Sequence, residues 1–188
     1  VYGTAVLLGE DKEKVKNIIK DLDGAPGRFE SIKSDKGATG IVDYSHTPDA
    51  LENVLKTISK IVVKPLSKVI TVVGCGGDRD KAKRPVMAKI GYEMSDILIL
   101  TSDNPRTENP EDILNDMRVG LPQVGPVGEK VYVISDRHLA IQKACDLAQS
   151  GDYILLAGKG HENYQEVNGV KTHFNDMEEL KKCFNKMI

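Results

Sequence analysis

Four short apolar runs in this chain each end abruptly in a dense cluster of polar residues or glycines. The runs are residues 40–42, 69–73, 97–100 and 153–157, and the clusters that follow them are residues 43–49, 74–79, 101–106 and 158–162. Short apolar runs with such boundaries are consistent with buried strands. If these strands are parallel members of one sheet, all four clusters lie at the edge where open α/β sheets bind ligands. The pattern predicts one composite site and favours an enzyme or a ligand-binding domain.

Between these runs, apolar residues recur at helical spacing. Helices are predicted over residues 11–22, from the Thr47 N-cap through Ile58, over 81–94, from Pro110 to before Gly120, from the Ser135-Asp136 cap to about 149, and from the Asp176 cap to 187. Residues 1–8 fit either a strand or the end of a helix. Residues 121–129, with two prolines and two glycines, are expected to form a loop.

Hairpins and one further strand complete the predicted elements. The strand covers residues 131–134, and the hairpins pair 28–33 with 40–44 and 164–167 with 170–174. Asn168-Gly169 in the second hairpin suits a type I′ turn. Strands that alternate with long helices predict an α/β fold: a Rossmann-like, mostly parallel sheet flanked by helices, with hairpin additions.

Composition and charge narrow the function classes. The 188 residues fit one domain with at most a small appendage, and the net charge of −2 argues against nucleic-acid binding. Three scattered cysteines indicate free thiols in a reducing cytoplasm and, with four scattered histidines, argue against a zinc site. No apolar run approaches the about 20 residues that span a bilayer. The chain opens at Val1 without an initiator methionine, which we interpret as a piece of a longer protein.

The glycine-rich cluster after the second run suits an anion. Gly74, Gly76 and Gly77 would free backbone amides to approach one, and Arg79 would add a guanidinium. The chain contains neither Gly-x-Gly-x-x-Gly nor the Walker pattern, so this is not a standard nucleotide fingerprint. The alternative is a tight strand-to-helix turn followed by a solvated, charged helix.

A proline fixes the next cluster, Ser102-Asp103-Asn104-Pro105-Arg106. Pro105 sets the turn and restricts Asn104 to extended angles. Arg106 could then clasp a ligand carboxylate with two hydrogen bonds, while Asp103 and Asn104 orient the loop or bind an ammonium group. A capped turn with a surface salt bridge is the alternative.

The clusters at residues 158–162 and 43–49 supply carboxylates and a histidine to the expected site. Glu162, in Gly158-Lys159-Gly160-His161-Glu162, is the candidate partner of a substrate amine, whereas Lys159 and His161 fit equally well as solvated loop residues. Asp43 suits a ribose hydroxyl. His46 suits a stacking or polar contact, or simply a histidine satisfied within a turn.

Opposite charges on one edge indicate a zwitterionic ligand. Arg79 and Arg106 would take carboxylates and Glu162 an amine, which fits an amino acid with two carboxylates better than a nicotinamide. Arg28, taken alone, is interpreted as a surface residue.

Five stretches that occur in order carry a resemblance to a known family. They are PGRFE (26–30), DYSHTPDAL (43–51), GCGGDRDKAKRP (74–85), DNPRTE (103–108) and GKGHENYQ (158–165). Together they resemble the C-terminal domain of Mur ligases, in particular the type that adds 2,6-diaminopimelate. The resemblance runs from about Val1 to the last predicted helix.

The resemblance implies an ATP-dependent acid–amino-acid ligase of cytoplasmic peptidoglycan-precursor synthesis. Such an enzyme joins meso-diaminopimelate to UDP-N-acetylmuramoyl-L-alanyl-D-glutamate through an acyl phosphate. The diaminopimelate-binding residues carried over by motif are Arg79, Asp103, Asn104, Pro105, Arg106, Gly158 and Glu162, and the ATP-binding residues are Arg28, Asp43 and His46. Relatives that add lysine depart from Asp-Asn-Pro-Arg, because lysine lacks the distal carboxylate that Arg106 would bind.

The resemblance also implies what lies outside this chain. Residues 1–23 would end a central domain and linker, and residues 24–188 would form the C-terminal domain. The N-terminal domain and the central ATPase domain, which holds Mg²⁺ beside ATP, would lie elsewhere in the protein. We therefore assign no catalytic residue here, and we expect these residues alone to be inactive, monomeric, and bound by small molecules but not by nucleic acid or membrane.

Two other functions remain open from the residues alone. One is a dinucleotide-dependent oxidoreductase domain, which the missing glycine fingerprint disfavours. The other is an amino-acid sensor without catalysis.

Overall fold

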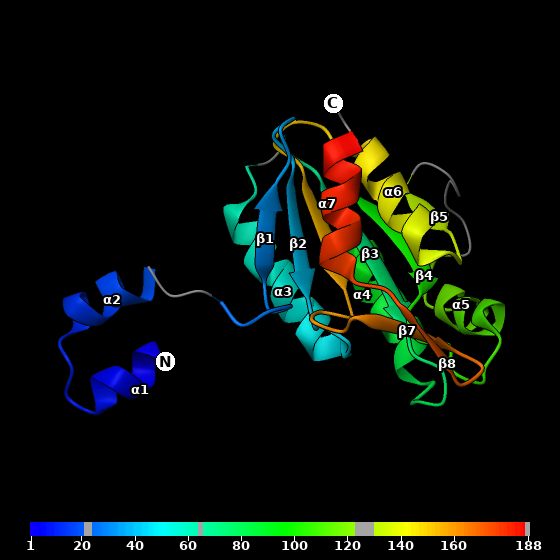
Figure 1. Ribbon diagram of the computed structural model, residues 1–188, viewed down its shortest axis with the longest axis horizontal. Coiled ribbons are helices and arrows are strands. Elements are labelled where there is room, and N and C mark those ends of the chain that lie inside the picture. Colours follow the sequence, from blue (N-terminus) through cyan, green and yellow to red (C-terminus); the bar gives the residue numbers. More distant parts are fainter. Residues whose placement is uncertain (21–23, 64–65, 123–129, 187–188) are drawn as a thin grey trace.

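A computed structural model describes residues 1–20, 24–63, 66–122 and 130–186 and shows a six-stranded sheet with helices on both faces (Figure 1). The strand order is β1-β2-β6-β3-β4-β5, and a separate pair, β7-β8, forms a hairpin. The strands are β1 (Glu30–Lys33), β2 (Thr39–Asp43), β3 (Val69–Cys75), β4 (Ile97–Ser102), β5 (Val131–Val133), β6 (Tyr153–Ala157), β7 (Tyr164–Val167) and β8 (Val170–His173). All neighbours in the large sheet are parallel except β1 and β2.

The helices form two layers around the sheet. They are α1 (Tyr2–Leu7), α2 (Lys12–Lys20), α3 (Pro48–Ile61), α4 (Lys83–Met94), α5 (Pro110–Arg118), α6 (Arg137–Leu147) and α7 (Asp176–Lys186). In Figure 1, α6 and α7 cover the near face of the sheet and α3, α4 and α5 lie behind it, while α1 and α2 lie to one side. Within the described residues, no helix is both long and apolar enough to cross a bilayer.

Alternation along the strands explains this layering. In β2, Ile41 packs into the core under α3, α4 and α5, and its neighbour Val42 packs into the core under α6 and α7. Leu155 and Leu156 of β6 divide in the same way. Because successive strand residues point to opposite faces, strands buried on both sides read as continuous apolar runs. The fold class expected from the sequence is confirmed.

Local signals in the sequence account for most element boundaries. Thr47 caps α3 by accepting from the Ala50 N–H at 3.3 Å, and Asp136 caps α6 by accepting from the Leu139 N–H at 3.1 Å. Asn168 and Gly169 have φ of 50° and 75°, as a type I′ turn requires. Residues 2–7 are a helix, which decides between the two alternatives for the start of the chain. Most of the loop expected at 121–129 lies outside the described residues.

The cap expected for the last helix is wrong by one residue. The side chain of Asn175 accepts from the Glu178 N–H at 3.0 Å and so caps α7, whereas Asp176 is the first helical residue. Asp176 is buried against Arg137 instead, at 2.6 Å. Because the buried Arg137 guanidinium pairs with Asp176, the neighbouring Asn175 caps the helix instead.

Strand register brings the four polar clusters together. Asp43 at the end of β2 pairs with Ala157 of β6, Ala157 also pairs with Val73 of β3, and Cys75 of β3 pairs with Ser102 of β4. The carboxyl ends of all four central strands therefore form one continuous edge. The clusters that follow them emerge side by side, as the apolar runs predicted.

Candidate ligand-binding site

A cavity of about 840 Å³ lies at this edge, within the size range of small-molecule sites. Every one of the four clusters contributes to its lining. The expected site residues that line it are His46, Arg79, Asp103, Asn104, Arg106, Gly158 and Glu162, joined by Tyr44, Gly76, Asp80, Lys83 and Tyr164 among others. Pro105, Arg28 and Asp43 are not among the residues that line this cavity. The expectation that Arg79, Arg106 and Glu162 meet at a single rim is confirmed.

The loops after β3 and β4 interlock through their backbones. Gly77 donates its N–H to the Asn104 carbonyl at 2.9 Å, and Arg106 Nη1 donates to the Gly77 carbonyl at 2.8 Å. A Cβ on Gly77 would overlap the Pro105 carbonyl, so only glycine permits this approach. Pro105 is buried at this contact, where it shapes the loop without entering the cavity.

The β7–β8 hairpin fixes the backbone of Arg106. Its N–H donates to the Glu166 carbonyl at 3.0 Å, and its carbonyl accepts from the Asn168 N–H at 2.6 Å. These bonds hold Arg106 at φ 54°, a left-handed conformation that an arginine adopts only when its surroundings impose it. Nη1 is occupied, and within the described residues Nε and Nη2 have no hydrogen-bond partner. Arg79 is exposed and has no such partner there either.

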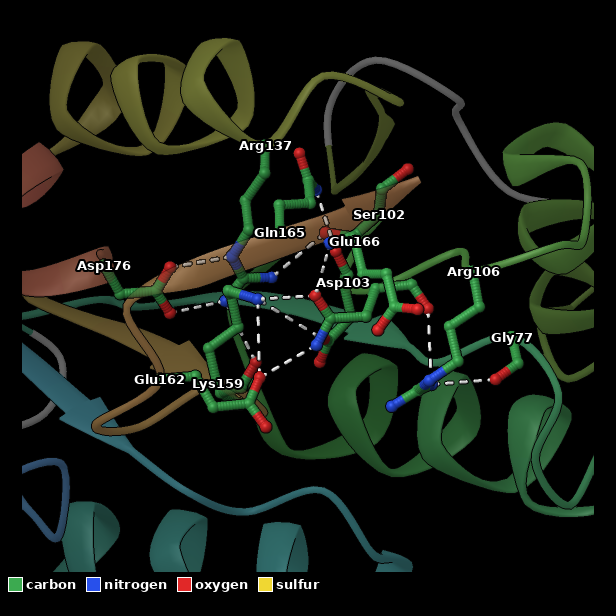
Figure 2. Close-up of polar contacts among 12 residues, drawn as sticks. Gly77, Ser102, Asp103, Arg106, Arg137, Lys159, Glu162, Gln165, Glu166 and Asp176 are labelled. Carbon is green, nitrogen blue, oxygen red and sulfur yellow. Dashed lines mark hydrogen bonds and ion pairs between the residues drawn. The ribbon is translucent and has the colours of Figure 1, made fainter. Parts of the chain in front are cut away.

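A buried lysine, Lys159, contacts side chains from two loops of the site (Figure 2). The Lys159 side chain is 0% exposed, and its Nζ lies 3.1 Å from Asn104 Oδ1, 3.5 Å from Glu162 Oε2 and 3.6 Å from Asp103 Oδ1. Sequence reasoning left Lys159 open as a solvated residue, and that alternative is wrong. The available signal was a lysine between two glycines directly after a buried strand.

Asn104 orients the loop. Its Nδ2 donates to Glu162 Oε2 at 2.8 Å, and its Oδ1 accepts from Lys159 and, at 3.0 Å, from the Glu166 N–H. Of the two alternatives from the sequence, the loop-orienting one matches this geometry. Glu162 Oε1 has no hydrogen-bond partner among the described residues and remains available.

Aromatic and charged groups gather at the end of β2. The Tyr44 ring has the His46 ring at 4.5 Å, the His161 ring at 5.3 Å and the Arg28 guanidinium carbon at 5.0 Å from its centroid. Asp43 Oδ2 accepts from the Phe29 N–H at 2.9 Å, whereas Oδ1 has no hydrogen-bond partner among the described residues. Tyr44 and His46 belong to the cavity wall, so this group adjoins the site directly.

Two buried arginines that the sequence did not single out support these loops. Arg137 pairs with Asp176 through two bonds and also donates to the Ser102 and Ala157 carbonyls at the ends of β4 and β6. Burial alone would lower the pKa of Arg137, but Asp176 outweighs burial and raises it. Arg84 makes two bonds to Glu108 and one to Asp116, which ties α4 to the loop that carries Arg106.

The cysteine in the glycine-rich turn is not an activated thiol. Burial raises the pKa of Cys75 to about 12, so it stays protonated at neutral pH. In the described part of the chain, no three His, Cys, Asp or Glu side chains gather as metal ligands.

Comparison with known proteins gives a consistent result. Residues 27–160 match the family described as Mur ligase, glutamate ligase domain. The chain is 56% identical over 185 residues to the UDP-N-acetylmuramoyl-L-alanyl-D-glutamate–2,6-diaminopimelate ligase of Bacteroides thetaiotaomicron, covering 98% of this chain and 38% of that protein. A solved structure of a ligase of the same name superimposes with a TM-score of 0.79 at 42% identity, over 99% of this chain and 37% of that one.

A more distant structure shares the fold alone. It is a bifunctional folylpolyglutamate synthase/dihydrofolate synthase from Yersinia pestis complexed with AMPPNP and Mn ion, with a TM-score of 0.54 and 21% identity over 73% of this chain and 29% of that one.

Proposed function

The chain belongs to the Mur ligase family, through its glutamate ligase domain, and on that premise we propose that it binds the incoming amino acid and part of the nucleotide in an ATP-dependent ligase. The ligase joins meso-diaminopimelate to UDP-N-acetylmuramoyl-L-alanyl-D-glutamate in peptidoglycan-precursor synthesis. The chain spans 38% of the length of its Bacteroides relative, so this activity belongs to the whole protein that carries it.

The observation that carries the proposal is the pairing of free charges across one cavity. Among the described residues, Arg79 and the Nε and Nη2 atoms of Arg106 have no hydrogen-bond partner on one side, and Glu162 Oε1 has none on the other. Guanidinium groups pair well with carboxylates, and a carboxylate pairs with an ammonium group. An amino acid with acid groups at both ends satisfies all of these, Asp103, Asn104 and Gly158 form part of the wall around it, and Pro105 shapes the loop behind that wall.

Arg106 supplies the specificity. Its φ of 54° and its bonds to Gly77 and Glu166 fix the direction of the guanidinium before any ligand arrives. Lysine lacks the distal carboxylate and would leave the donors of the half-buried Arg106 guanidinium unpaired, and unpaired polar groups make such sites discriminate between substrates. Diaminopimelate is therefore the preferred substrate.

Arg28, Asp43 and His46 serve the nucleotide. The free oxygen of Asp43 suits a ribose hydroxyl, Arg28 suits phosphate, and the Tyr44–His46 rings suit a base. ATP transfers its terminal phosphoryl group to the D-glutamate carboxylate and leaves as ADP. One amine of diaminopimelate, in its unprotonated form, attacks the resulting acyl phosphate, loses a proton and expels phosphate, while the other amine remains as the ammonium group that Glu162 would bind. Mg²⁺, which neutralises the ATP phosphates, is assigned mainly to ligands elsewhere in the protein.

The cellular location and the binding partners follow from the proposed substrates. We place the protein in the cytoplasm, where UDP-linked precursors are found and where cysteines outside disulfide bonds, such as the buried Cys75, Cys145 and Cys183, are usual. We further propose that it acts as a monomer on small molecules and does not bind nucleic acid, in line with its net charge of −2.

The test is phosphate release by the full-length protein. ATP and the UDP-dipeptide are supplied with either diaminopimelate or lysine. We expect phosphate release with diaminopimelate, and a kcat/KM with lysine of at most about a hundredth of that value. Sites built to bind a polar group reject analogues that lack the group. Equal efficiency with both would contradict the substrate assignment. Binding of diaminopimelate without phosphate release would instead indicate a sensor.

A further inference from the structure

We propose that Lys159 is a positioning residue that fixes the Glu162 carboxylate for the amine of the substrate. This inference rests on the proposed function, because it concerns the amine side of the same cavity. Lys159 is fully buried and does not itself line the cavity. It therefore acts on the ligand through Glu162.

The ammonium group of Lys159 has two hydrogen-bond acceptors and one further carboxylate at ion-pair distance. Its ammonium group carries three N–H donors. The oxygens of Asn104, Glu162 and Asp103 lie 3.1, 3.5 and 3.6 Å from Nζ, and they come from two different loops. A buried lysine is costly unless it is paired, and here every pairing is with a side chain of the candidate site.

Charge balance gives the lysine a second role. Asp103 and Glu162 place two carboxylates beside one ammonium group, and the neighbouring Arg137 is neutralised by Asp176. The group of Asp103, Glu162 and Lys159 therefore carries one net negative charge. That charge matches a single substrate ammonium. Without Lys159, both carboxylates would lose the cation that now lies beside them.

The geometry also decides which oxygen of Glu162 meets the ligand. Lys159 and Asn104 both bind Oε2, and this leaves Oε1 free (Figure 2). Holding one oxygen from two directions restricts the rotation of the carboxylate. A fixed carboxylate loses less conformational entropy on binding than a mobile one.

Loop stability alone does not require this lysine. The loop after β4 is already joined to β7, the strand that follows the Glu162 loop, by the bond from Gln165 Nε2 to the Asp103 carbonyl at 2.7 Å and by the bond from the Glu166 N–H to Asn104. The strand end is held separately, by the Gly158 N–H on the Asp43 carbonyl at 3.1 Å. A methionine would fill similar volume without the cost of burying a charge.

The experiment replaces Lys159 in the full-length protein. Lys159→Met is expected to raise the KM for diaminopimelate at least about tenfold, while the KM values for ATP and the UDP-dipeptide stay within about twofold. Lys159→Gln, which keeps amide donors but no charge, is the second variant and is expected to do the same, so the result does not depend on the folding of one variant. Lys171→Met is the matched control, because Lys171 lies over the same Tyr164 ring but is exposed.

A double-mutant cycle separates positioning from a merely structural role. In a Glu162→Gln background, Lys159→Met should change the KM for diaminopimelate less than about threefold, because the group it positions is already altered. The inference would be overturned if Lys159→Met changed the KM for diaminopimelate equally in the wild-type and Glu162→Gln backgrounds, or if neither Lys159 variant changed that KM. The ligase assignment would stand in either case. A wild-type protein without diaminopimelate-dependent phosphate release would reject the proposed function, and this inference with it.

Discussion

Charged side chains at the site divide into those that hold loops and those left for a ligand. Glu108 belongs to the first kind: it binds Arg84 twice, accepts the Asp78 N–H at 2.6 Å and lies 3.2 Å from Lys81. Arg79, two residues before Lys81, has no such partner among the described residues. Glu108 therefore links the loop that carries Arg79 to the loop that carries Arg106.

The pKa of Glu108 makes this link sensitive to acid. Hydrogen bonds from Arg84, and then from the Asp78 N–H, lower it from 4.5 to about 2. A lowered folded-state pKa stabilises the fold above the unfolded value, and this stabilisation is lost as pH falls from about 4.5 towards about 2. We predict that the difference in unfolding free energy between the wild type and Glu108→Gln shrinks over that range, as measured by urea unfolding. Glu93→Gln, on the exposed side of α4, is the matched control. A difference independent of pH would contradict the link.

The residue types of the site could be predicted, but their partners could not. Arg79, Arg106 and Glu162 were brought to one rim by their positions after parallel strands. The burial of Lys159 depends on Asn104, Asp103 and Tyr164, which lie up to 56 positions away in the chain. A lysine between two glycines after a buried strand marks the position, but that local pattern does not report whether the side chain will meet oxygens from a distant loop or water.

At the scale of elements, Arg137 ties two strands to a helix. It starts α6, binds Asp176 at the start of α7, and donates to the last carbonyls of β4 and β6. Both ionic side chains are 0% exposed. The ends of the two strands that carry the Asp103 and Glu162 loops are therefore held from the face opposite α3, α4 and α5.

Removing one partner of this pair should be costly. Arg137→Met leaves Asp176 buried without a cation, and we predict a loss of about 3–5 kcal/mol in unfolding free energy. The double variant Arg137→Met with Asp176→Leu should recover much of that loss, because no buried charge remains. Urea unfolding of both variants measures this. A loss below about 1 kcal/mol in the single variant would show that the pair does not hold the elements together.

Elements were predicted better than their exact ends. Apolar runs and capping residues located the central strands and most helices, because both signals act locally. The start of α7 was placed on the wrong residue because Asp176 is claimed by a distant arginine. β3 also continues two residues beyond its apolar run, through Gly74 and Cys75, since its backbone still pairs with β4 there.

At the scale of the whole molecule, one edge of one sheet gathers every group that the proposed reaction needs from this chain. The positive groups Arg79 and Arg106 come after β3 and β4, the negative Glu162 comes after β6, and the aromatic group around Tyr44 comes after β2. Amino acid and nucleotide would thus bind to adjoining parts of the same edge. In this arrangement, Arg106 would bind the distal carboxylate of an amino acid that has a carboxylate at each end.

Steady-state kinetics of Arg106→Ala in the full-length protein test that claim most directly. We predict that the KM for diaminopimelate rises at least about tenfold, equivalent to about 1.4 kcal/mol, and that the preference over lysine falls by a similar factor. Arg118→Ala, an exposed arginine of α5, serves as the control. An unchanged KM for diaminopimelate with preference over lysine retained would contradict the account.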